Sequence, residues 1–121
     1  MADRLLAALA ALLGALGVAG SAAAAHLGGP TLATAAQFAL FHASGIFAAL
    51  WLARSGLARA GLARAAAWLL ALGAVLFSGA VALGSFGLHP VPMAAPTGGT
   101  TLIAAWIILA VSALAGPGRA D

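Results

Sequence analysis

Between Ala65 and Gly87 the chain reads AAAWLLALGAVLFSGAVALGSFG, without a charged side chain. These 23 residues are enough to cross, as a helix, a hydrocarbon core about 30 Å thick. A single helix satisfies the hydrogen bonds of its own backbone, which lipid cannot do. This stretch is therefore predicted to be a membrane-spanning helix.

Three further stretches of the chain have the same character and nearly the same length. Their predicted bounds are about 5–25, 31–53 and 97–115, and the bounds of the stretch above are 65–87. Glycine and proline, which end helices, follow the first span at Gly29-Pro30 and the fourth at Gly116-Pro117. The pattern predicts an all-α fold, a four-helix transmembrane bundle that forms one domain over residues 1–121.

The composition excludes several classes of protein. Of the 121 residues 64% are hydrophobic and 6% are charged, whereas about 25% are charged in a typical soluble domain. A soluble enzyme and a disordered tail are therefore excluded. The chain has no cysteine, which excludes disulfides, iron–sulfur clusters and thiolate metal sites. No basic run with interleaved aromatic residues indicates nucleic-acid binding.

The arginines predict how the chain crosses the membrane. With four spans, both termini and the middle loop share one side, and the five arginines of the chain all fall there. The connections on the other side, residues 26–31 and 87–96, carry no Lys, Arg, Asp or Glu. The positive-inside rule then places both termini in the cytoplasm. The arginines are Arg4 and Arg119 near the termini, and Arg54, Arg59 and Arg64 in the expected middle loop.

The middle-loop arginines have two compatible interpretations. They can simply end the spans, with long side chains that extend toward water. They can also contact anionic lipid headgroups, because each arginine near the cytoplasmic leaflet contributes roughly 1 kcal/mol to membrane binding. We therefore regard Arg54, Arg59 and Arg64 as candidate lipid-headgroup contacts.

The first span also resembles a cleavable signal peptide. Arg4 precedes a run of Leu and Ala, and the small residues of 21–25 are typical of a cleavage site. Cleavage would leave three spans in the same orientation, so the charges do not distinguish the two alternatives. We expect the span to be retained, because the uncut chain gives an even-numbered bundle.

Several polar residues fall inside the predicted spans. At 1.5 Å of helix rise per residue, His42 lies about 16 Å from the arginine side and Trp106 about 14 Å, near the membrane midplane. On the same count four further polar residues lie deeper, at about 20–24 Å: Ser78, Thr101, Gln37 and Ser21. The resulting candidate polar site consists of His42, Gln37, Ser78, Trp106, Ser21 and Thr101.

His42 is the only ionisable residue within the predicted spans, and such residues are candidates for function. The simplest interpretation is a neutral imidazole bonded to a carbonyl, to Ser44 or to the Trp106 indole. A proton relay or a ligand site is the alternative. Gln37 and the hydroxyls are most simply hydrogen bonds between helices, with a site for water or a small polar solute as the alternative.

Neither catalysis nor a cofactor is expected. His26 and His89 share a level at the ends of the first and third spans, so ligation of a haem by both is conceivable. However, no second histidine lies at the depth of His42, and no carboxylate lies in any span. Ser78 lacks the G-x-S-x-G motif of a serine nucleophile. We expect no metal and no cofactor.

The order of short motifs along the chain resembles the domain-of-unknown-function 423 (DUF423) family of small inner-membrane proteins. Gln37 followed by His42 matches a Gln-x(4)-His motif, and residues 76–79 match Leu-Phe-Ser-Gly. Residues 96–99 followed by Trp106 match Pro-x-Gly-Gly and a later Trp. The chain departs from the family where its motifs have a tyrosine, because it contains none.

The resemblance implies a multi-pass protein of the bacterial inner membrane and implies no reaction. It directs attention to Gln37, His42 and Ser78, and to Gly98 and Gly99 at the start of the fourth span. Our leading hypothesis is a non-catalytic accessory or stabilising subunit of a larger membrane assembly, whose partners are lipid and other membrane-protein subunits or a second copy. The alternative is a small oligomeric transporter or channel for protons or a small polar solute.

Overall fold

Four helices account for nearly all of the chain. The computed structural model describes residues 1–27, 29–88 and 91–118, and contains no strand in these ranges. Each helix is long and apolar enough to cross a membrane, so the protein is a multi-pass membrane protein and the predicted all-α bundle is confirmed. The helices are α1 (Ala2–Leu27), α2 (Pro30–Ser55), α3 (Ala60–Ser85) and α4 (Ala94–Leu114).

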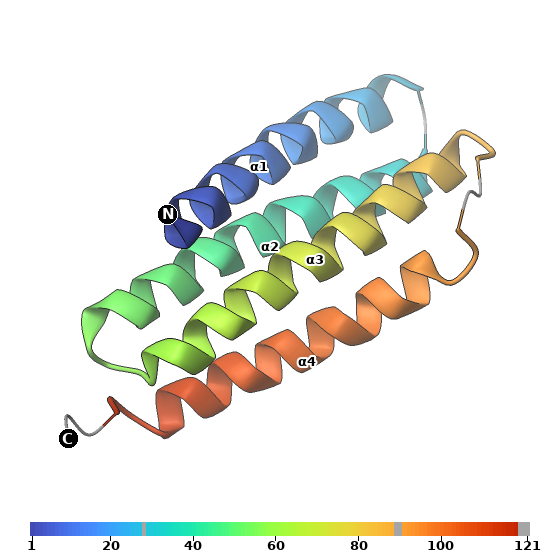
Figure 1. Cartoon of the computed structure of the whole chain (residues 1–121). Coiled ribbons are helices and arrows are strands. Elements are labelled where there is room, and N and C mark those ends of the chain that lie inside the picture. Colours follow the sequence, from blue (N-terminus) through green and yellow to red (C-terminus); the bar gives the residue numbers. More distant parts are fainter. Residues whose placement is uncertain (28, 89–90, 119–121) are drawn as a thin grey trace.

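Short connections make successive helices antiparallel (Figure 1). Pro30 opens α2, where the fixed φ of proline suits a first helical residue and its missing N–H costs nothing. Gly56 ends α2 with a positive φ of 74°, a conformation that L side chains rarely adopt. The helices therefore begin and end at residues whose backbone preferences favour a turn.

The structure corrects the predicted middle loop. Arg54 lies in the last turn of α2 and Arg64 lies inside α3, so that Arg59 is the one arginine between these helices. The third helix begins at Ala60, five residues before the predicted bound, and ends at Ser85 rather than Gly87. The physical reason is that an arginine limits the apolar segment but not the helix, because Arg is a good helix former.

The helices pack in the order in which they occur in the sequence. α1 contacts α2, α2 contacts α3 and α3 contacts α4, with a smaller contact between α1 and α3 (Figure 1). Helices α2 and α3 thus form the middle of the bundle. The Trp106 side chain also reaches from α4 to Gly45 of α2.

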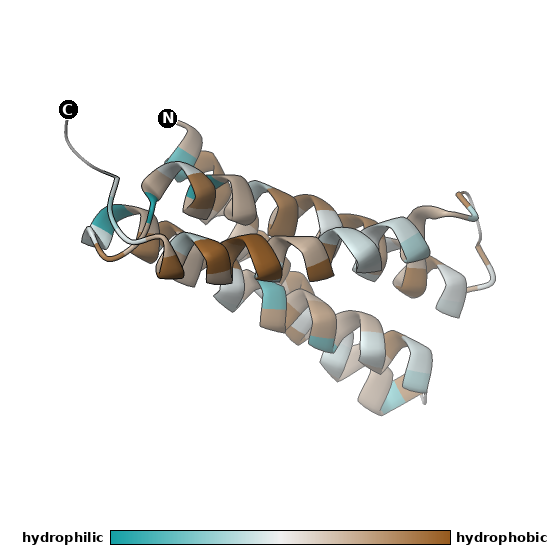
Figure 2. Ribbon diagram, turned by 90° about the horizontal axis from the view of Figure 1, so that it is seen from below, coloured by the Kyte–Doolittle hydropathy of each residue, from teal (hydrophilic) through white to brown (hydrophobic). Residues whose placement is uncertain are grey.

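Small side chains make up most of the bundle interior, and many large ones lie outside. Alanines dominate the buried residues, whereas Phe41 on α2 is 68% exposed and Leu114 on α4 is 89% exposed. Figure 2 shows brown, apolar residues along the whole length of the ribbon. Lipid gives helices no hydrophobic reason to associate, so close packing of small residues holds them together and the large side chains face lipid.

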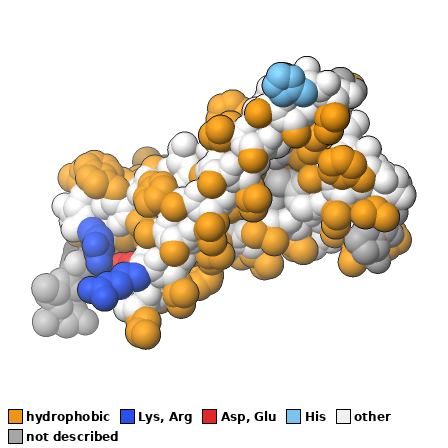
Figure 3. Space-filling model, turned by 90° about the horizontal axis from the view of Figure 1, so that it is seen from above, with side chains coloured by type: hydrophobic (Ala, Val, Ile, Leu, Met, Phe, Trp, Pro, Cys, Tyr) orange, Lys and Arg blue, Asp and Glu red, His pale blue; other side chains and the backbone are white. Residues whose placement is uncertain are grey.

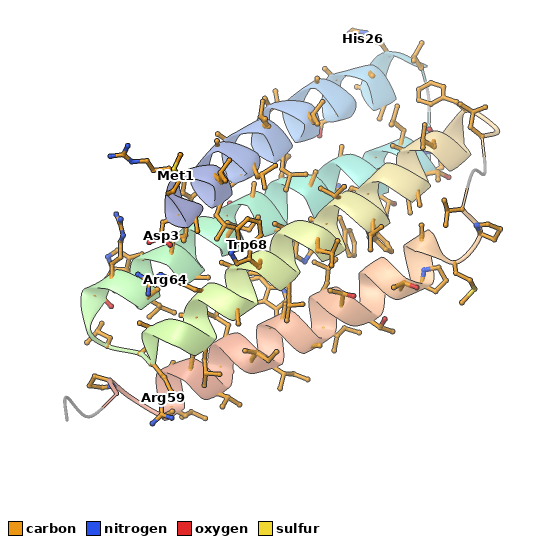
Figure 4. The ribbon with its side chains drawn as sticks, viewed as in Figure 1. Met1, Asp3, His26, Arg59, Arg64 and Trp68 are labelled. Carbon is orange, nitrogen blue, oxygen red and sulfur yellow. The ribbon has the colours of Figure 1, made fainter. Side chains whose placement is uncertain are left out.

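The two ends of the bundle differ. The first, which we call the arginine end, carries Asp3, Arg54 and Arg64, and the Arg59 N–H there donates a hydrogen bond of 2.9 Å to the Ser112 carbonyl of α4. We call the opposite end the His26 end (Figure 4). There the α1–α2 pair separates from the α3–α4 pair, so that the bundle is forked (Figure 2).

Candidate functional site

His42 lies in the middle of α2 with 7% of its surface exposed. Its Nδ1 atom is 2.6 Å from the Phe38 carbonyl oxygen, one turn earlier in the same helix. A carbonyl oxygen can only accept a hydrogen bond, so Nδ1 carries a proton and donates it, and in the neutral ring Nε2 keeps its lone pair. The partner is thus a carbonyl, one of the three partners that the sequence allowed.

His42 belongs to a cluster of aromatic side chains from three helices. Phe38 stacks on the imidazole at 5.6 Å between ring centroids, and the Trp106 ring of α4 lies at 6.2 Å. Phe77 of α3 contacts Phe38 at 4.4 Å between centroids. This aromatic cluster joins α2, α3 and α4 around the one buried imidazole that the structure describes.

The other predicted site residues do not join His42 and Trp106. Ser78 lines a groove between α1, α2 and α3. Ser21 and Gln37 line a second groove of about 350 Å³, which α1 and α2 form near the His26 end. The Thr101 hydroxyl donates to the Thr97 carbonyl of its own helix, at 2.8 Å. The six residues therefore form no single layer across the bundle.

The predicted hydrogen bonds between helices are not found for the serines and threonines that the structure describes. Thr34 and Ser44 of α2 donate to carbonyls four residues earlier in α2, and Ser112 donates to the Leu109 carbonyl of α4. A hydroxyl in a helix can reach a carbonyl of the preceding turn when its rotamer points back along the helix. This local bond is available without a partner helix, and it explains why the prediction was wrong.

Gly98 lies where α3 and α4 are closest. A Cβ atom on Gly98 would lie 2.5 Å from the Phe77 backbone nitrogen and 2.9 Å from the Gly73 carbonyl oxygen. A Cβ atom on the adjacent Gly99 would meet only the Phe77 ring, at 3.7 Å. Of the two glycines at the start of the fourth span, Gly98 is thus the one that the packing requires.

One carboxylate joins three helices at the arginine end. Asp3 of α1 accepts hydrogen bonds from Arg54 of α2 at 3.3 Å and from Arg64 of α3 at 3.1 Å (Figure 4). In Figure 3 the acidic group lies between the blue arginines at this end. Arg54 remains largely exposed and Arg64 is partly exposed, so the headgroup contacts predicted for Arg54, Arg59 and Arg64 stay compatible with these ion pairs.

Neither the ion pairs of Asp3 nor the bond from Arg59 to Ser112 was predicted from the sequence. Asp3 precedes all five arginines of the chain, which the positive-inside rule assigns to the same side of the membrane as Asp3. An acid and several arginines on the same side of the membrane indicate that Asp3 forms an ion pair with an arginine. The bond from Arg59 to the Ser112 carbonyl had no signal, because any residue can provide a backbone acceptor.

Replacing Asp3 with asparagine is expected to lower the Tm of the protein at low ionic strength, because both ion pairs to α2 and α3 are lost. The difference from the unchanged protein should shrink in high salt, which screens exposed charges. Thermal melts in detergent at two salt concentrations would measure it. Arg4→Gln is the matched control, since Arg4 has no ion pair among the described residues; an equal loss for both variants would contradict the assignment.

The histidines outside the spans do not form a recognisable ligand set. His26 is exposed at the end of α1 (Figure 4). His89, its conceivable partner for haem ligation, lies outside the described residues, as does Arg119. Within the described residues no three His, Cys, Asp or Glu side chains lie close enough together to hold a metal ion.

The comparisons with known proteins give one match. The model of a family described as "Protein of unknown function (DUF423)" matches residues 13–99, which include Gln37, His42, Ser78 and both glycines at the start of α4. No curated protein and no solved structure matches the chain. Because the match covers more than half of the chain, in the order of motifs described above, this protein belongs to the DUF423 family.

Proposed function

We propose that this protein is a non-catalytic accessory or stabilising subunit of a larger assembly in the bacterial inner membrane. Both termini lie in the cytoplasm in this proposal, because the arginines that the structure describes lie on the side of the α2–α3 turn and of both chain ends. The His42 environment favours a structural role, since rings and a carbonyl surround it and the described residues place no carboxylate beside it.

The observation that carries the proposal is the exposed position of Gln37. It lies about 24 Å from the arginine end of α2 by helix rise, still within a hydrocarbon core about 30 Å thick. The side-chain hydrogen bonds of α2 come from Thr34, His42, Ser44, Arg54 and Ser55, and none of these bonds involves Gln37.

An unpaired amide facing lipid costs free energy, and a partner helix would remove that cost. Gln37 is the only side-chain amide in the chain. It belongs to an exposed stripe at helical spacing on α2, which also contains Thr34, Phe41, Ser44 and Trp51. The exposed faces of α1 and α3 present mainly Ala, Leu and Val at the same depth, whereas α4 presents Thr97 and Thr100 there. The Thr100 hydroxyl bonds to carbonyls of its own helix.

The partner that fits this stripe is a transmembrane helix of another subunit. The groove beside Gln37 is lined by small residues, which let a second backbone approach closely. A hydroxyl, an amide or a free carbonyl on the partner at the depth of Gln37 would complete the bond. Phe41 and Trp51 would add contact area on either side of it.

Replacing Gln37 with methionine is expected to release the partner, because methionine keeps the length of the side chain and removes the amide. The measurement is native mass spectrometry of the protein extracted gently from its own membrane. The unchanged protein should give a defined heteromeric mass, and Gln37→Met should give mainly the free chain. Ser44→Ala is the control, since Ser44 lies in the same stripe but bonds within its own helix.

A lone monomer or a homo-oligomer of the unchanged protein would contradict the accessory role. The transporter alternative would then be tested by flux of protons in proteoliposomes. It has one observation in its favour, the Nε2 atom of His42, for which the structure describes no hydrogen bond. That alternative requires His42→Ala to abolish flux while the helices stay folded.

A further inference from the structure

A groove lies between α1, α2 and α3 on the side of the bundle toward the His26 end. Its volume is about 270 Å³. The fork in which the two helix pairs separate lies at the same end (Figure 2; Figure 3). The walls are almost entirely apolar and include Leu16 and Gly20 of α1, Leu32 and Ala36 of α2, and Val75 and Ala82 of α3.

Ser78 is the one polar side chain among the residues that line this groove. Ser78 is 7% exposed, and its Oγ is a buried polar atom for which the described residues provide no hydrogen-bond partner. The buried hydroxyl of Ser112 shows the contrast, because it bonds to the Leu109 carbonyl. A buried hydroxyl without a partner costs free energy. An occupant of the groove would satisfy this hydroxyl once the Ser78 side chain turns its Oγ from the buried position toward the groove.

Depth and charge restrict the occupant. Ser78 is fourteen residues beyond Arg64 in α3, so it lies about 21 Å from the arginine end and about 9 Å inside a ~30 Å hydrocarbon core. No charged side chain lines the groove. A charged headgroup at that depth would need a partner of opposite charge. The occupant is consequently uncharged where it meets Ser78.

The size of the groove restricts the occupant further. Pockets for drug-sized ligands measure about 300–1,000 Å³, so a volume of about 270 Å³ accepts one slender chain rather than a large ring system. Small residues on all three helices keep the groove narrow. An apolar chain with one uncharged hydrogen-bonding group satisfies the volume, the apolar wall and the hydroxyl together.

We propose that this groove binds a neutral lipid, one of whose chains lies along the groove while an uncharged carbonyl or hydroxyl group bonds to the Ser78 hydroxyl. The site is separate from Gln37, which lines another groove, between α1 and α2. The neutral-lipid site and the accessory role can therefore fail independently.

The test uses the full-length protein in phosphatidylcholine nanodiscs with a diacylglycerol that carries a photoactivatable diazirine in one acyl chain. Mass spectrometry should locate the adducts on α1, α2 and α3 beside the groove. Unlabelled dioleoylglycerol should compete for the site, and phosphatidylglycerol should not. Ser78→Ala should lower the labelling about threefold, the effect of one hydrogen bond within a membrane.

A matched pair of variants tests the groove itself. Ala82→Leu fills it and should lower the labelling at least tenfold. Ala80→Leu makes the same change two residues earlier on α3, about 200° away around the helix, where the side chain lines a different groove. It should leave the labelling unchanged. Helix content by circular dichroism and Tm show whether each variant is folded.

Three results would overturn the proposal. The first is equal labelling by a phosphatidylcholine that carries the same diazirine, which would mean that any lipid chain enters. The second is unchanged labelling in folded Ala82→Leu. The third is unchanged labelling in Ser78→Ala. This variant removes a single oxygen atom, so it still tests the proposal if Ala82→Leu does not fold.

Discussion

Replacing Gly98 with alanine is expected to lower the Tm of the protein by roughly 10 °C, the effect of one to three kcal/mol of overpacking in a chain of this size. The new Cβ atom would lie 2.5 Å from the backbone nitrogen of Phe77 and 2.9 Å from the backbone oxygen of Gly73. Neither atom belongs to a flexible side chain. Helix α4 must therefore move away from α3, and the contacts along the whole interface weaken.

Gly99→Ala is the control for this prediction. The Cβ atom of that variant would make an ordinary contact with the Phe77 ring, at 3.7 Å. Alanine also favours a helix over glycine by about 1 kcal/mol. Its Tm should equal or slightly exceed that of the unchanged protein in the same detergent. Equal melting temperatures for Gly98→Ala and Gly99→Ala would contradict the close approach of the two backbones.

Replacing Gly45 with alanine is expected to destabilise the bundle, and a smaller residue at position 106 should relieve much of the damage. A Cβ atom on Gly45 would lie 2.9 Å from Cζ2 and 3.0 Å from Cη2 of Trp106. Trp106→Leu alone also destabilises, because the contact of the ring with α2 is lost. In the double variant the new methyl group has space, so the effects should differ from additivity by about 1–2 kcal/mol.

Thermal melts of the four proteins of this double-mutant cycle measure the coupling. The fluorescence of Trp106, in a background where Trp51 and Trp68 are replaced by phenylalanine, reports whether its ring has moved. Gly14→Ala is the matched control, since its Cβ atom would meet only Ala43, at 3.9 Å. Additive effects of Gly45→Ala and Trp106→Leu would show that the ring does not pack on Gly45.

The number of helices and their approximate bounds could be predicted because an uncharged apolar segment of membrane length has few other stable structures. The assignment of Arg54 and Arg64 to a loop was wrong because the charged residues mark the end of the apolar segment and not the end of the helix. Hydropathy locates the apolar part of a helix, whereas the helix continues until a residue such as Gly56 ends it. Residues around charged helix ends are therefore the least predictable part of this fold.

The candidate site was less predictable because depth does not specify direction. Gln37 and His42 are five residues apart, which rotates them by about 140° around α2. His42 consequently faces Trp106 of α4, whereas Gln37 lies on the exposed stripe. A count of residues along each span assigned both to one site. Only the packing of α2 against its neighbours specifies which of the two points inward.

The serial packing of the helices has a consequence for synthesis of the protein. Each helix finds its main packing partner in the helix made immediately before it, so the bundle can assemble in the order of insertion. Contacts between neighbours in sequence form quickly, because little chain entropy is lost in closing them. The contact of Trp106 with Gly45 spans two helices and can form only after α4 has entered. It is therefore suited to be the last step, which fixes α4 against α2.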